Sequence, residues 1–245
     1  MSGYVVLVLC GLFASGYGQF SETRQVEEPF NGIAVDGPFA INVDIGDKDS
    51  IVLSGSNKDF IKAVETVVEN GTLKIRFNNW DTKFTGILQI AVTTKSIINL
   101  VAAGPAQITS RSNMKGQVFR IVVSGSAQVI ANIEASTVVV VVSQSASMIG
   151  SVTSKNINAV LANSGTITLS GTTDNANVVV SGSGVFHGFG LNAATISTTA
   201  NGSGQAEVNA SQEIKASATD DAVVRTQGTS NVSKDEQDRG TVQSA

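Results

Sequence analysis

A three-residue corner motif recurs every 19 residues through the middle of this chain. Its clearest copies are Ser124–Ser126 and Ser181–Ser183, and the step is 21 residues only between the first and second copies. The central residues of the seven copies are Gly104, Gly125, Gln144, Asn163, Gly182, Asn201 and Asp220. Six of these seven are Gly, Asn or Asp, the residue types that adopt left-handed backbone in tight turns. A repeat of this length is typical of solenoids, in which each repeat forms one coil.

The residues that lead into each corner alternate between apolar and polar types. Ile157, Ala159 and Leu161, for example, precede the corner at Asn163. Alternation with a period of two predicts strands that are buried on one face. An antiparallel sandwich would place turns every 8 to about 12 residues, but it gives no reason for the same corner to return. Stacked parallel coils about 4.8 Å apart do give that reason, because equivalent residues then form columns.

We therefore predict an all-β fold in which residues 98–228 form a right-handed parallel β-helix with coils of 19–21 residues. Residues 24–97 are less regular and are expected to continue into it. Strand-like runs in this portion lie at Ile33–Val35, Ala40–Ile45, Ile51–Leu53, Leu73–Phe77 and Ile87–Thr93. Between them, the apolar spacing over Lys58–Glu69 predicts a short helix that ends at Asn70–Gly71. This helix would either cap the solenoid or pack on its side.

The two ends of the chain differ from its middle. The apolar run Tyr4–Ser15 is too short for a membrane span and has the length of a signal-peptide core. We expect a signal peptide over residues 1–18, cleaved after Gly18 or alternatively after Gly16. Cys10, the single cysteine, lies inside it, so the mature chain would have neither a cysteine nor a transmembrane segment. The protein would be secreted or extracellular, or in the cell envelope if bacterial. Residues 229–245 are predicted to be a polar C-terminal tail, either frayed or forming a weak terminal cap.

Charge composition excludes one broad class of partner. Charged residues make up 15% of the chain and the formal net charge is -4, so no basic footprint for nucleic acid is present.

Four glycosylation sequons are present, at Asn70, Asn201, Asn209 and Asn231. They occur about as often as chance predicts and do not indicate glycosylation.

Several short motifs resemble the head GIN domain family, secreted proteins described as auto-transporter adhesin heads. They are Glu28–Val35, Gly37–Phe39 and Asn70–Ile75, together with the repeated Ser-Gly-Ser corners. The resemblance covers roughly residues 24–228. It implies a β-helix similar in shape to pectin-lyase folds, no established catalytic residues, and a role in adhesion.

The residues with reactive side chains do not form a recognisable catalytic set. His187 is the only histidine and is expected to point outward, in a column without partners for catalysis or metal binding. Asp44, Asp47 and Asp49 do not have EF-hand spacing and are interpreted as a solvated turn. Asp220–Asp221 is interpreted as the last corner, and Trp80 as a loop anchor rather than a sugar-stacking platform.

The glycine-rich run Ser181–Gly184 is interpreted as a corner, because it lacks the lysine and the following helix of a phosphate-binding loop. We therefore predict no catalytic, cofactor-binding or metal-binding residues, and no cofactor.

One apolar surface feature is expected. Val122, Val141, Val160 and Val179 occupy one outward column and would form an apolar stripe. Exposed stripes mark interfaces, and we expect the first portion or its helix to cover this one, with self-association into a homo-oligomer as the second possibility.

The sequence thus favours a non-enzymatic adhesion or binding protein whose partner is a surface, matrix or glycan ligand. The alternatives are a polysaccharide lyase or hydrolase on the same scaffold, and a structural matrix protein. An enzyme would need clustered acids on one face, and a structural or ice-binding solenoid would need regular outward threonine rows. Thr166 and Thr168 give only one local instance of such a row.

Overall fold

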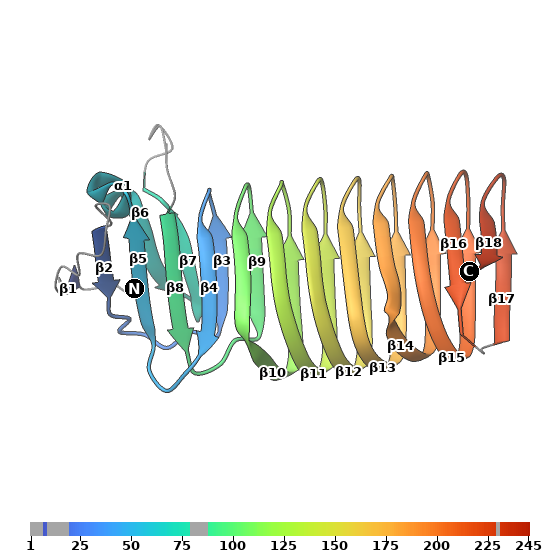
Figure 1. The fold of residues 1–245 in the computed structure, drawn as a ribbon, viewed down its shortest axis with the longest axis horizontal. Coiled ribbons are helices and arrows are strands. Elements are labelled where there is room, and N and C mark those ends of the chain that lie inside the picture. Colours follow the sequence, from blue (N-terminus) through green and yellow to red (C-terminus); the bar gives the residue numbers. More distant parts are fainter. Residues whose placement is uncertain (1–6, 9–19, 79–87, 229–230) are drawn as a thin grey trace.

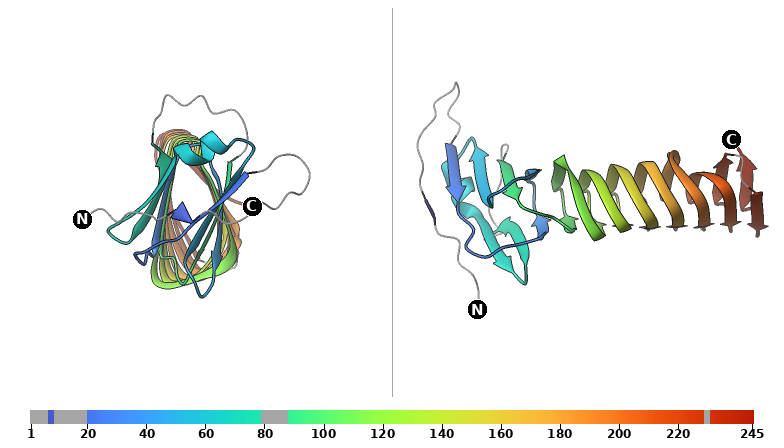
Figure 2. Two further views of the ribbon diagram at one scale, coloured as in Figure 1. Left: turned by 90° about the vertical axis from the view of Figure 1, so that its left-hand side faces the viewer. Right: turned by 90° about the horizontal axis from the view of Figure 1, so that it is seen from below.

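The computed structural model describes residues 7–8, 20–78, 88–228 and 231–245. Apart from residues 7–8, the predicted signal peptide lies outside the described residues, as does Trp80. The described chain forms a long parallel β-solenoid with a broader N-terminal end (Figure 1; Figure 2). The predicted fold is confirmed: strands dominate, one short helix is present, and the coils repeat about every 19 residues.

The regular part of the rod consists of long bent strands, one per coil. They are β10 (Gln107–Val123), β11 (Gln128–Val142), β12 (Ser147–Leu161), β13 (Thr166–Val180), β14 (Val185–Ala200) and β15 (Gln205–Ala218). Each pairs with the next in parallel. Between β11 and β12 and between β12 and β13, residues 19 apart are partners, as in Val141 beside Val160. The stacking therefore converts each repeat position into a column along the rod.

The inward columns form the core. In β12, for example, Met148, Val152 and Leu161 have no measurable exposure. One inward column runs through Phe119, Val138, Ile157, Ala176, Ile196 and Ile214. Burial of a large aliphatic side chain contributes about 1.5–3 kcal/mol, so the repeated Val, Ile and Leu positions stabilise every coil in the same way.

The tight corners use left-handed backbone. Gly104, Gly125, Gln144, Asn163, Gly182 and Asp220 have φ values between 58° and 75°. At the sixth corner the left-handed residue is Gly202, with φ of 71°, so the assignment of Asn201 to this column was wrong. The coil of β14 is one residue longer than the coil of β13, and its register shifts between Thr168 and Gly171, which moves the next corner by one position.

The N-terminal portion continues the parallel stack and adds antiparallel strands to it. Its strands are β1 (Leu7–Val8), β2 (Phe20–Arg24), β3 (Gly32–Asp36), β4 (Ala40–Ile45), β5 (Ser50–Gly55), β6 (Val64–Glu69), β7 (Thr72–Phe77), β8 (Leu88–Thr94) and β9 (Asn99–Ala103). β4 and β9 pair in parallel with β10 and so join this portion to the solenoid. β2 and β8 both pair antiparallel with β5.

The helix is shorter than the sequence predicted. α1 covers only Lys58–Ala63, with Asn57 as its N-cap. Residues 64–69 form strand β6, which pairs antiparallel with β7 through a turn at Asn70–Gly71. Both turn residues have positive φ, the conformation that favours a two-residue hairpin. Three valines and a threonine in β6 favour the strand over a longer helix.

The predicted polar tail is a further coil. After β16 (Val223–Gln227), β17 (Asn231–Glu236) pairs in parallel with β15, and β18 (Thr241–Ser244) pairs in parallel with β16. A last corner at Asp238, with φ of 56°, joins them. Of the two alternatives for this segment, the frayed tail is wrong for the described residues 231–245, because backbone pairing on an existing coil forms these strands although few apolar residues are present.

Among the described residues, no helix has the length and apolar character needed to cross a membrane.

Candidate functional site

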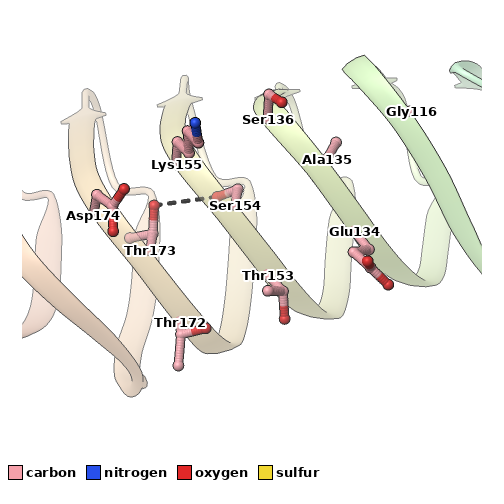
Figure 3. Close-up of a pocket in the computed structure, with 10 residues that line it drawn as sticks. All are labelled: Gly116, Glu134, Ala135, Ser136, Thr153, Ser154, Lys155, Thr172, Thr173 and Asp174. Carbon is pink, nitrogen blue, oxygen red and sulfur yellow. Dashed lines mark hydrogen bonds between the residues drawn. The ribbon is translucent and has the colours of Figure 1, made fainter.

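A shallow groove lies on the bend of four successive coils (Figure 3). Its volume is about 470 Å³. The groove is lined by Gly116 of β10, by Glu134, Ala135 and Ser136 of β11, by Thr153, Ser154 and Lys155 of β12, and by Thr172, Thr173 and Asp174 of β13. Sequence reasoning missed this site, because the hollow depends on how the coil bends rather than on any residue motif.

The lining residues form three parallel columns. Strand pairing places Gly116, Ala135, Ser154 and Thr173 one above another as the floor. Glu134, Thr153 and Thr172 form one wall, and Ser136, Lys155 and Asp174 form the other (Figure 3). The groove therefore runs along the axis of the solenoid, and each coil adds one equivalent set of groups.

Hydrogen bonds between coils fix the groove's polar groups. The Ser154 hydroxyl donates to the Thr173 Oγ1 at 3.1 Å, and that hydroxyl donates to the Asn175 carbonyl at 3.2 Å. On the wall, the Ser136 hydroxyl donates to the Gln117 amide oxygen at 3.1 Å. These contacts hold the hydroxyl oxygens in place, which favours binding because fewer rotamers are lost when a ligand docks.

The charged groups of the groove differ in their partners. Glu134 forms an ion pair with Lys115 at 2.9 Å and accepts a hydrogen bond from Asn113 at 3.2 Å. Lys155 and Asp174 are both exposed, and they occupy adjacent coils of one wall. Neither forms an ion pair with another described residue. The groove thus offers one ammonium group and one carboxylate for a ligand.

The predicted apolar stripe lies on a different outward face. Val122, Val141, Val160 and Val179 are consecutive partners in register. Val160 is 37% exposed and the other three are half-buried. Helix α1 packs against β2, β5 and β6 instead, so, of the alternatives for covering the stripe, the one in which the helix covers it was wrong.

His187 has a partner that sequence reasoning overlooked. Its Nδ1 lies 2.8 Å from Glu207 Oε2 in the next coil, and Arg225 lies 4.0 Å from the other oxygen of the same carboxylate. The sequence did not predict this contact. All three side chains lie on the outside of the rod, and His187 is about half exposed.

The two acidic candidates lie at or near turns. Asp44 is the second-last residue of β4, and Asp47 and Asp49 lie on the connection between β4 and β5. No group of three described His, Cys, Asp or Glu side chains is arranged to hold a metal. Asp220 is a corner residue whose carboxylate accepts a hydrogen bond from the Gly202 N–H at 3.1 Å. Asp221 pairs with Arg239, and this hydrogen bond raises the pKa of the Arg239 guanidinium.

The run Ser181–Gly184 is likewise a corner, in which Gly182 is left-handed. The candidates that the structure describes therefore lie on separate turns and faces, and no catalytic or metal-binding set forms among them.

Comparison with known proteins gives a family and a fold. The family described as "Putative auto-transporter adhesin, head GIN domain" matches residues 29–151 and 132–230. No curated protein matches the sequence.

Solved structures share the fold at low sequence identity. A "putative adhesin" from Parabacteroides merdae is similar with a TM-score of 0.88 and 20% identity, over 93% of this chain and 96% of the other. A "putative adhesin" from Parabacteroides distasonis has a TM-score of 0.87 and 23% identity, over 93% and 97%. A "putative lipid binding protein" from the same species has a TM-score of 0.83 and 22% identity, over 92% and 96%.

Proposed function

Because this chain belongs to the family described as "Putative auto-transporter adhesin, head GIN domain", we propose that it is a non-enzymatic binding protein whose role is adhesion. It acts at the cell surface or in the extracellular space, after removal of residues 1–18. Its partner is a component of a surface or matrix.

The groove over β10–β13 is the observation that supports this proposal most. It presents hydroxyl, amine and carboxylate groups from the three coils of β11, β12 and β13 on a rigid parallel stack. A rigid array of equivalent groups favours binding to repetitive partners, since several weak contacts form together when the partner repeats.

An enzyme on this scaffold is the competing function, and the groove's carboxylates argue against it. Glu134 and Asp174 lie on β11 and β13, two coils apart, which corresponds to about 10 Å along the axis. The carboxyl pairs of retaining glycosidases are about 5 Å apart, and those of inverting enzymes reach about 9.5 Å. Glu134 is also drawn away from Asp174, because its partners Lys115 and Asn113 both belong to β10.

Adhesion of coated particles tests the proposal. Beads carrying the secreted chain should be retained on matrix components or cells under flow, and soluble chain should compete for retention. Incubation of the same preparation with neutral and acidic polysaccharides should release no reducing ends or unsaturated products. Product release, or retention no greater than that of uncoated beads, would count against a binding role.

Lipid binding is a second candidate, favoured by the outward valine stripe. The stripe Val122, Val141, Val160 and Val179 runs over four coils beside more polar columns, and one solved structure with this fold is described as a "putative lipid binding protein". Co-flotation with phosphatidylcholine vesicles that Val141→Asp and Val160→Asp abolish would support it. Absence of co-flotation by the unmodified chain would exclude it.

A further inference from the structure

We propose that the groove over β10–β13 binds a neutral, linear glycan that lies along the axis of the solenoid. This inference rests on the proposed binding function and names its ligand class. The groove's direction, its ends, its polar groups and its charge balance carry the argument.

The floor column gives the direction and length of the site. Gly116, Ala135, Ser154 and Thr173 are small and lie in register on four coils, a span of about 14 Å at the spacing of adjacent strands. A side chain at Gly116 would meet Ile98, whose Cγ2 lies 3.2 Å from the position of a Cβ there. Beyond Thr173 the column continues to Ala193 of β14, and the register then shifts on both sides of Ala193 in its pairing with β15. The site therefore suits a short stretch of an extended chain.

The walls supply the groups that recognise sugar hydroxyls. Thr153 and Thr172 lie on one wall, and Lys155 and Asp174 on the other. A hydroxyl both donates and accepts, an ammonium donates, and a carboxylate accepts up to four hydrogen bonds. Because Lys155 and Asp174 form no ion pair with another described residue, both remain free to bond adjacent hydroxyls of one sugar.

The charge balance selects a neutral chain. Lys155 is matched by Asp174 on the next coil, and Glu134 is matched by Lys115 in an ion pair. A polyanionic glycan would meet as many carboxylates as ammonium groups and would gain no net attraction. None of the ten lining residues is aromatic, so recognition depends on hydrogen bonds and each site binds weakly.

NMR titration of the isotopically labelled chain with defined oligosaccharides tests whether the groove binds a neutral glycan. The probes are linear hexasaccharides of β-1,4-glucan, β-1,4-mannan, β-1,4-xylan and α-1,4-glucan, with hexagalacturonate as the acidic probe. At least one neutral probe should shift the amide signals of residues 134–136, 153–155 and 172–174. Lys155→Ala with Asp174→Ala should weaken that binding by about tenfold or more, the loss expected when two charged hydrogen-bonding groups are removed.

A matched control lies on the same two coils. Asn158 and Asn177 are exposed and outward on β12 and β13, so Asn158→Ala with Asn177→Ala should leave binding unchanged. Shifts centred elsewhere, equal losses in both double variants, or binding of hexagalacturonate alone would overturn the assignment. If no glycan binds while coated beads still adhere, this inference fails and the proposed function stands. If the beads also fail to adhere, both fail.

Discussion

Each tight corner leaves one backbone N–H outside the regular ladder. At the second corner, the N–H groups of Ser124 and Ser126 donate to carbonyls of the preceding coil, whereas the Gly125 N–H donates to the side-chain oxygen of Gln144 at 2.5 Å. Asp220 accepts in the same way from Gly202 at 3.1 Å. A polar corner residue thus compensates for the cost of left-handed backbone, which explains why Gln and Asp occur where Gly would be less strained.

Gly182→Val should destabilise the solenoid by at least about 2 kcal/mol, because a β-branched residue is strained at positive φ. Gly182 has φ of 75°, and a Cβ there would lie 2.9 Å from the Asn163 carbonyl oxygen. Urea unfolding followed by circular dichroism measures the change. Asn163→Gly is the control at the neighbouring corner, where φ is 61°, and it should cause no loss. Equal stability of Gly182→Val and the unmodified chain would contradict the corner assignment.

Thr198→Val should stabilise the protein by about 1 kcal/mol, because it removes a buried hydroxyl that has no partner. Thr198 is 1% exposed and its Oγ1 forms no hydrogen bond. It lies in an inward column between Val178 and Ala216, so a valine of similar shape fits there. Thr199→Val, on the exposed side of the same strand, should change the free energy of unfolding by much less. A loss of stability in Thr198→Val would show that the hydroxyl is satisfied in solution.

Strand β2 is joined to α1 and β6 by one buried arginine. Arg24 pairs with Glu22 at 2.7 Å and donates to the carbonyls of Ile61 and Val64. Arg24→Met would leave the Glu22 charge and these carbonyls without a partner, and should cost about 3–5 kcal/mol locally. Hydrogen exchange should then quicken in β2, α1 and β6 and stay slow in β11–β13, because coils interact mainly with their neighbours.

Glu22→Gln added to Arg24→Met should recover part of that protection, since no buried charge then remains unpaired. Uniform loss of protection along the whole rod would contradict the local role of Arg24.

The sequence predicted those elements whose residues repeat in register. Strands β10–β15 were predictable because Val, Ile and Leu return to the same inward columns. The sixth corner was misplaced because β14 is one residue longer than β13, which counting in steps of 19 does not detect. Residues 64–69 were predicted to be helical because Val64, Val67 and Val68 have helical spacing, although Val64, Thr66 and Val68 also alternate as in a strand over so short a run. The groove could not be predicted, since its hollow comes from the curvature of the coil.

Over the whole molecule, two inward columns that are apolar along β10–β15, apart from Thr198, become charged in β17. Lys234 follows Ala216, and Glu236 follows Ala218. The Lys234 ammonium donates to the Val242 carbonyl at 2.8 Å, and the Val242 N–H donates to Glu236. Both side chains are exposed, and they occupy the positions that continue the two inward columns at this coil. Inward charges of this kind discourage another strand edge from adding to an exposed one.

Lys234→Ile with Glu236→Val should therefore make the protein self-associate, because the apolar columns would continue to the exposed end of the last described coil. Light scattering coupled to size-exclusion chromatography should show a mass that rises with concentration. Ser233→Ile with Asp235→Val adds similar apolar side chains to the outward positions of the same strand, and it should stay closer to the unmodified mass. If both double variants associate equally, surface hydrophobicity alone drives association, and the inward charges of β17 have no special role.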